Sequence, residues 1–179
     1  DTTITLRPTV DGGDDSASWT NTAGTACNGV DCSLEVKEAS GASCTNSDGD
    51  TSYVQSNTTG AKQTFDIDES SIPDNSTITQ IDITVCVRKS TTGAANSFQT
   101  RRCADGVCAS SGTTLTTGNA YAESTQSHMG LNIIKTATTD IEVGAEIMGS
   151  VANNVRLSQI SAVITYTTPT PTPSSTSTP

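Results

Sequence analysis

The stretch "STITQIDITVCVRK", residues 76–89, decides the fold. Apolar and polar side chains alternate along it. The apolar set is Ile81, Ile83, Val85 and Val87, and the polar set is Asp82, Thr84, Cys86 and Arg88. Because successive side chains of a strand point to opposite faces of a sheet, this period of two predicts a strand with one buried and one solvated face. Such a strand is typical of an antiparallel sheet.

Shorter alternating stretches lie on both sides of this strand. We expect strands at 2–10, through Tyr53 and Val54 at the end of a turn in 47–54, and at 62–67, 97–103, 113–117, 120–126, 131–137 and 155–167. Pro8 lacks a backbone donor, so the first of these is predicted to be an edge strand. In the last, the apolar phase slips between Leu157 and Ile160, which predicts a β-bulge.

The composition agrees with an all-β fold. The 179 residues include 33 Thr and 23 Ser and are only 3% aromatic, and Thr suits a pleated sheet better than a helix. Residues 139–151 are ambiguous between the period of a strand and that of a helix, and we expect one short helical turn there. Many short strands joined by polar turns predict a single antiparallel two-sheet β-sandwich, jelly-roll-like. The expected organisation is an N-terminal strand at 1–10, a sandwich at 11–167 and a Pro/Thr/Ser-rich tail at 168–179.

The net charge of −10 creates a field that repels phosphate backbones and anionic headgroups. Nucleic acid is therefore not an expected partner. No apolar run approaches the length of about 18 residues that a membrane span needs, so membrane insertion is not expected either. The sequence starts at Asp1, and we read it as a processed, secreted, extracellular or cell-surface product.

Six cysteines suit an oxidising compartment. Cys27 and Cys32 bracket "CNGVDC", and Cys103 and Cys108 bracket "CADGVC", so a turn in each loop can bring the two residues within disulfide reach. Cys44 and Cys86 then remain as a third pair. A pairing of Cys86 with Cys103 is the alternative, if residues 81–103 form one hairpin.

Calcium is the one metal that the sequence suggests. Two glycine-containing loops hold the acidic candidates Asp11, Asp14, Asp15, Asp48 and Asp50, and carboxylate oxygens are the ligands that calcium prefers. The same residue types are also the default residues of turns. No other cofactor is indicated.

No catalytic constellation is recognisable, and we expect no enzyme activity. His128 is the only histidine, and no nucleophile motif accompanies it. We expect it to be a solvated surface residue.

Glycosylation is predicted at two kinds of position. Asn57 and Asn75 begin Asn-x-Ser/Thr sequons in expected loops. The tail alternates Thr and Pro, which favours an extended polyproline rod with closely spaced hydroxyl groups for O-linked glycans. The candidates there are Thr168, Thr170, Thr172, Ser174, Ser175 and Thr176.

Several segments together resemble a known type of module. They are "LRPTVDG" followed by a Trp, "SDGDTSYV", "FDIDESSIPDNSTITQIDITVCVRK" and "LSQISAVITYT", and they span residues 4–167. They look like the secreted jelly-roll β-sandwich modules of microbial surface and extracellular proteins. That resemblance implies a structural or adhesive role and supplies no catalytic residues. Six cysteines are a departure from it.

Two functions follow as expectations. The first is a subunit of an extracellular, pilus-like filament, in which the strand carrying Ile4, Leu6, Pro8 and Val10 is donated to the next copy of the chain. Its partners would be copies of itself and covalent glycans. The alternative is a secreted carbohydrate-binding or adhesive β-sandwich module, against which the scarcity of aromatic residues counts.

Overall fold

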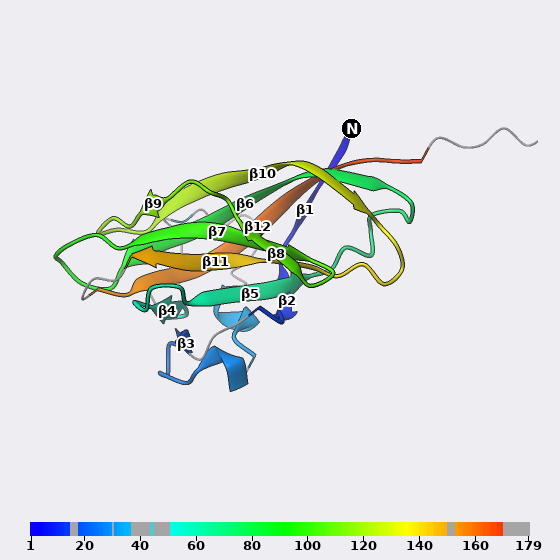
Figure 1. The fold of residues 1–179 in the computed structure, drawn as a ribbon. Coiled ribbons are helices and arrows are strands. Elements are labelled where there is room, and N and C mark those ends of the chain that lie inside the picture. Colours follow the sequence, from blue (N-terminus) through cyan, green and yellow to red (C-terminus); the bar gives the residue numbers. More distant parts are fainter. Residues whose placement is uncertain (15–17, 30, 37–43, 45–50, 150–152, 170–179) are drawn as a thin grey trace, which may run out of the picture.

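Two antiparallel β-sheets pack face to face in the computed structural model, as Figure 1 shows. The structure describes residues 1–14, 18–29, 31–36, 44, 51–149 and 153–169.

Sheet A has the strand order β10 (Ala122–Ile134), β6 (Thr77–Lys89), β12 (Val155–Thr167), β4 (Val54–Ser56) and β3 (Thr20–Asn21), and β1 (Thr2–Leu6) also pairs with β12. Sheet B has the order β2 (Pro8–Asp11), β5 (Lys62–Ile67), β11 (Ile141–Gly149), β7 (Ser97–Ala104) and β8 (Val107–Ser110), and β9 (Leu115–Thr116) also pairs with β7. Two short 3-10 turns, η1 (Cys27–Gly29) and η2 (Ser33–Val36), are the helical elements of the described residues. The prediction of an all-β, jelly-roll-like sandwich is confirmed.

The core lies between the two sheets. The four apolar side chains that alternate along β6 are all 2% exposed or less. They belong to the same apolar cluster as Val143, Ala145 and Ile147 of β11 in the other sheet. Burial of a side chain of this size stabilises the fold by roughly 1.5–3 kcal/mol, so β6 has the central role that its alternation predicted.

The N-terminal strand is bound within its own chain, which corrects the expectation of a donated strand. Ile4 pairs with Ile164 of β12, and the chain crosses at Arg7 to sheet B, where Pro8 pairs with Ile67. Ile4 and Leu6 pack against the core, Pro8 is buried, and Val10 is 46% exposed. The main-chain groups that donation would use already have partners in β12 and β5. Pro8 does lie on an edge strand, as predicted, because β2 ends sheet B.

Within the segment 139–151, where we expected a helical turn, residues Ile141–Gly149 form the strand β11, and residues 150 and 151 lie outside the described part of the chain. β11 pairs with both β5 and β7, so it lies inside sheet B and its period of two decides the structure. The backbone of β5 approaches β11 so closely at Gly144 that no side chain fits there. A Cβ at this position would lie 1.9 Å from the carbonyl oxygen of Gln63.

The other expected strands fall close to their predicted places. The segments 120–126 and 131–137 join into the single strand β10, with a bulge between Met129 and Ile133. β12 carries the predicted bulge between Leu157 and Gln159. β6 and β7 belong to different sheets, so residues 81–103 are not one hairpin and the alternative disulfide has no basis.

The cysteines pair as Cys27–Cys32, Cys44–Cys86 and Cys103–Cys108. These are the pairs that the two short loops favoured. No helix among the described residues is long and apolar enough to cross a membrane.

Candidate functional site

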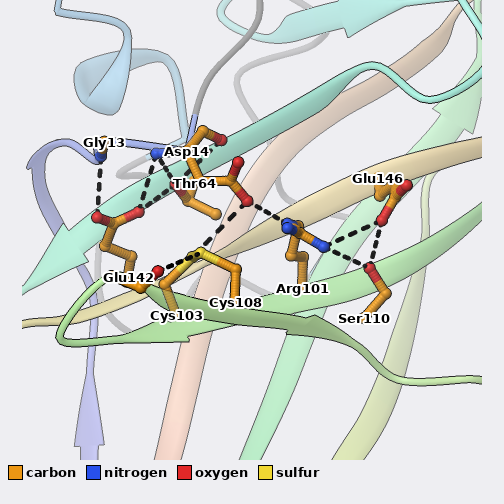
Figure 2. Close-up of a disulfide and its surroundings, with 10 residues drawn as sticks. Gly13, Asp14, Thr64, Arg101, Cys103, Cys108, Ser110, Glu142 and Glu146 are labelled. Atoms are coloured by element: carbon orange, nitrogen blue, oxygen red, sulfur yellow. Dashed lines mark hydrogen bonds and ion pairs between the residues drawn. A yellow bond between two sulfur atoms is a disulfide. The ribbon is translucent and has the colours of Figure 1, made fainter.

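A polar network covers the outer face of sheet B beside the Cys103–Cys108 disulfide, as Figure 2 shows. The Glu142 carboxylate accepts hydrogen bonds from the backbone amides of Gly13 at 2.9 Å and Asp14 at 3.3 Å, and from the hydroxyl of Thr64. These bonds hold the loop after β2 against the sheet. Glu142 is 5% exposed, and three donors compensate the loss of its hydration.

Arg101 joins this loop to the far side of the network. Its guanidinium forms ion pairs with Asp14 and with Glu146, the second at 3.2 Å. Ser110 accepts a hydrogen bond from Arg101 at 3.1 Å and donates its hydroxyl to Glu146 at 2.5 Å. A guanidinium between two carboxylates uses several of its five donors at once. The network therefore fixes the structure of this face.

The calcium ligands that we expected do not come together among the described residues. Asp14 is paired with Arg101, and Asp11 accepts a hydrogen bond from the amide of Cys32 at 2.9 Å. Asp15, Asp48 and Asp50 lie outside the described residues. The loop of Asp11 and Asp14 thus uses its carboxylates to bind other parts of the same chain.

A different acidic group forms where β5 meets β11. Carboxylate oxygens of Asp66, Asp140 and Glu142 lie within 4.8 Å of one another. Burial, together with the negative charges of Asp140 and Glu142, raises the pKa of Asp66 to about 6. Carboxylates at this spacing could share a hard cation or a proton.

A polar groove of about 650 Å³ opens beside this group. Its lining residues are Thr9, Asp66, Ile67, Asp68, Glu69, Ser70, Asp74, Lys135, Ala137 and Asp140. Lys135 is buried, and its Nζ lies 3.5 Å from Oδ1 of Asp74. Burial also raises the pKa of Glu69. The groove presents hydroxyl and carboxylate acceptors without an aromatic wall.

The outer face of sheet A carries a second arrangement, which we call the tyrosine–arginine row. Its members are Tyr121, Arg88, Arg156, Gln55 and Tyr53. Arg156 lies opposite Arg88 of β6 on one side and opposite Gln55 of β4 on the other. The Arg88 guanidinium carbon is 5.2 Å from the centre of the Tyr121 ring, and that of Arg156 is 4.2 Å from the Tyr53 ring. Arg156 also donates a hydrogen bond to Gln55 at 3.1 Å.

Tyr121 gives this row an accessible aromatic surface. All six aromatic residues of the chain lie in the described part, and Tyr121 is the one that is not buried. Arg88 and Arg156 are half-buried beside it. A π-face, guanidinium donors and an amide thus share one solvent-facing surface. Sequence reasoning missed the row because its members come from four segments of the chain, and Tyr53 and Arg156 are 103 residues apart. The one available signal was the position of Arg88 on the polar face of the alternating stretch 76–89.

His128 corrects the expectation of a surface histidine. It is 6% exposed on the inner side of β10, and its Nε2 lies 3.1 Å from the Thr100 hydroxyl. Burial, and next the charge of Arg102, lower the pKa of His128 to about 4. A neutral imidazole bonded to a buried hydroxyl stabilises the packing of β10 on β7.

The predicted N-glycosylation positions are accessible. Both are exposed, Asn57 directly after β4 and Asn75 in a turn before β6. Of the predicted O-glycosylation positions, Thr168 is exposed, and Thr170, Thr172, Ser174, Ser175 and Thr176 lie outside the described residues. Glycosylation at these positions stays a prediction.

No family model and no curated protein matches the chain. Among solved structures, it is similar to the CBM22-1 xylan-binding domain from Paenibacillus barcinonensis Xyn10C, with 7% identity over 88% of this chain and 96% of that chain at a TM-score of 0.44. It is also similar to the xylan-binding module CBM15, with 10% identity over 88% and 97% of the two chains at a TM-score of 0.41. A third similar structure is the GH26-CBM35 β-(1,4)-mannanase of Podospora anserina, with 16% identity over 96% of this chain at a TM-score of 0.40. The chain spans 29% of the length of that mannanase chain.

Proposed function

We propose that this chain is a carbohydrate-binding β-sandwich module of an extracellular protein, and that the tyrosine–arginine row is its binding surface. The observation that carries the proposal is the alignment of Arg88 on β6 and Arg156 on β12 with Tyr121, the residue directly before β10. A sugar ring has an apolar face of C–H groups and an edge of hydroxyl groups. The exposed part of the Tyr121 ring can pack against the apolar face, and the guanidinium and amide groups can form hydrogen bonds with the hydroxyl groups.

The supporting strands make this surface rigid. Arg88 lies on β6 and Arg156 on β12, the two long central strands of sheet A. These strands pair with each other at twelve positions of β12. The Cys44–Cys86 disulfide is anchored on β6 two residues from Arg88. A surface that keeps its shape loses little conformational entropy when a ligand binds. Three disulfides also favour an oxidising, extracellular setting for the module.

Polymerisation by strand exchange has less support. The expected donor strand is part of both sheets of its own chain, so donation would first require its removal from β12 and β5. Carbohydrate binding to the row requires no strand to leave its sheet, because within the described part of the chain the row lies on the outer face of sheet A.

Affinity electrophoresis tests the proposal. The native-like chain is run through gels containing xylan, β-(1,4)-mannan, cellulose derivatives or a polyuronate. We expect at least one polysaccharide to retard the wild type, and the Tyr121→Ala variant to lose at least ten-fold in affinity. Met129→Ala is the matched control, because Met129 is an apolar side chain, 67% exposed, on β10 and eight residues after Tyr121.

Two results would count against the proposal. If none of the polysaccharides retards the wild type, the chain is not a carbohydrate-binding module of this kind. If Tyr121→Ala and Met129→Ala bind as the wild type does, the row is not the binding surface.

A further inference from the structure

A groove of about 460 Å³ lies on the open side of the sandwich, between β10 and the hairpin of β7 and β8. Its lining residues are Arg102, Ala104, Asp105, Val107, Gly130, Leu131, Asn132, Ile133 and Ile134. Val107 is 71% exposed and Ile134 is 49% exposed. Both are large apolar side chains, so the walls of the groove expose apolar surface that a monomer does not use.

Arg102 places a positive charge in this groove. Its register opposite Val143 puts it on the inner side of β7. Its Nε is buried without a hydrogen-bond partner, and within the described ranges no carboxylate forms an ion pair with it. Asp105, the acidic residue of the lining, instead accepts a hydrogen bond from the amide of Asp140 at 3.0 Å.

Among the residues that the structure describes, Arg102 therefore has no counter-ion. Burial lowers the pKa of Arg102, and a charge removed from water without a partner is unfavourable. A carboxylate matches a guanidinium in both charge and shape, since the two groups can form paired hydrogen bonds. An anionic ligand would therefore offset the free energy that the free protein loses by burying this unpaired charge.

The backbone beside the groove favours an extended peptide as the ligand. β10 ends sheet A and β8 ends sheet B, so within the described part of the chain each has one edge without a neighbouring strand. An added peptide strand obtains its affinity from such edges, and side-chain pockets give it specificity.

We propose that this groove binds the free C-terminus of an extended peptide whose last side chain is apolar. Arg102 receives the terminal carboxylate, and Val107, Leu131 and Ile134 surround the last side chain. The groove lies at the end of β10 opposite to Tyr121, so this binding is independent of the carbohydrate site.

His128 provides a reporter of the event. It is the only histidine of the chain, and the charge of Arg102 contributes to the low pKa of its imidazole, while Asp82 acts in the opposite direction. A carboxylate bound to Arg102 offsets that charge. The pKa of His128 should then rise in the complex with a peptide acid and stay lower in the complex with the matching C-terminal amide, which brings no carboxylate to Arg102.

The test is an NMR titration of the full chain with the peptide N-acetyl-Ser-Thr-Val-Ile, either as the free acid or as the C-terminal amide. We expect the acid to bind at least ten-fold more tightly than the amide. We also expect the acid to raise the pKa of His128, measured from the pH dependence of its ring signals. Arg102→Gln should reduce the affinity for the acid to that for the amide. Arg7→Gln is the matched control, because it removes one guanidinium at the crossing from β1 to β2 and should leave binding unchanged.

A second variant keeps the test decisive if Arg102→Gln fails to fold. Val107→Asp replaces an exposed side chain, adds a negative charge to the groove and should abolish binding of the acid. Equal binding of acid and amide, or no binding of either, would overturn the proposal. Octanoate that binds more tightly than the peptide acid would also overturn it, since the groove would then recognise an amphipathic carboxylate without peptide backbone.

Discussion

Arg88 and Arg156 lie directly opposite each other in the ladder between β6 and β12. Like charges in this position repel and destabilise a sheet. Each guanidinium lies over a different tyrosine, Arg88 over Tyr121 and Arg156 over Tyr53. The two rings therefore draw the charges to opposite sides of the pair and offset part of their repulsion.

The pair of Tyr53 and Arg156 should show a favourable coupling. We expect a double-mutant cycle with Tyr53→Leu and Arg156→Met to give about 0.5–1 kcal/mol, as for cation–π pairs near a surface. Urea unfolding of the four proteins measures it. A coupling of zero would mean that the stacked geometry contributes nothing to stability.

Replacement of Arg101 should destabilise the protein strongly. Arg101→Met leaves Asp14 and Glu146, whose side chains are 24% and 18% exposed, without their shared cation. We expect a loss of about 2–3 kcal/mol, because two partly buried carboxylates then repel each other. Arg101→Lys keeps the charge but loses the planar donors, and should fall between wild type and Arg101→Met in urea unfolding. A loss below half a kilocalorie for Arg101→Met would contradict the role given to the network.

The disulfides should differ in what they contribute. Cys44–Cys86 closes a loop with a sequence separation of 42, and Cys103–Cys108 closes one of 5. Chain entropy then predicts a loss of about 4 kcal/mol for the Cys44→Ser/Cys86→Ser variant and about 2 kcal/mol for Cys103→Ser/Cys108→Ser. Chemical unfolding of both double variants measures the difference, and the reverse order would show that contacts in the folded state outweigh loop entropy.

The pH dependence of stability should contain two opposed contributions. The pKa of Asp66 rises from 3.8 to about 6 on folding, so the native state binds more protons than the unfolded chain in this window and stability falls as pH rises through it. The pKa of His128 falls from 6.5 to about 4, so the unfolded chain binds more protons there and stability rises with pH.

Single variants separate these contributions. Relative to wild type, Asp66→Asn should gain stability as pH rises from about 4 to about 6, and His128→Gln should gain as pH falls from about 6.5 to about 4. Urea unfolding at intervals of half a pH unit provides the curves. If the stability of either variant changes with pH as that of the wild type does over its pH range, the pKa assigned to that residue is wrong.

Gly144 should tolerate no side chain. A Cβ there would meet the backbone of Gln63 and Thr64 at 1.9 and 2.7 Å, and neither strand can move without breaking the β5–β11 ladder. We expect Gly144→Ala to cost at least about 3 kcal/mol or to prevent folding. Gly118→Ala is the control, because the nearest atom to its Cβ would be the Ala120 oxygen at 3.8 Å. Similar melting temperatures for the two variants would refute the close approach.

The strands with a clear alternation could be predicted from local sequence. β5 at 62–67, β6 at 77–89 and β12 at 155–167 fall where their patterns place them, and so does the bulge after Leu157. The segment 139–151 could not be resolved in this way, because Val143, Ile147 and Val151 satisfy the helical period as well as the strand period. Its two neighbours in sheet B decide the matter.

The sequence by itself determined which side chains of β6 face the core, because alternation is a property of a single strand and does not depend on its neighbours. It also favoured the disulfides of the two short loops, whose ends cannot separate far, and the placement of β6 and β7 in different sheets then removed the Cys86–Cys103 alternative. Only the tertiary structure decided what lies side by side: the row of Tyr121, Arg88 and Arg156, the acid group of Asp66 and Glu142, and the pairing of the N-terminal strand. These depend on strand order and register between distant segments, and no local pattern in the chain encodes which edge a strand will join.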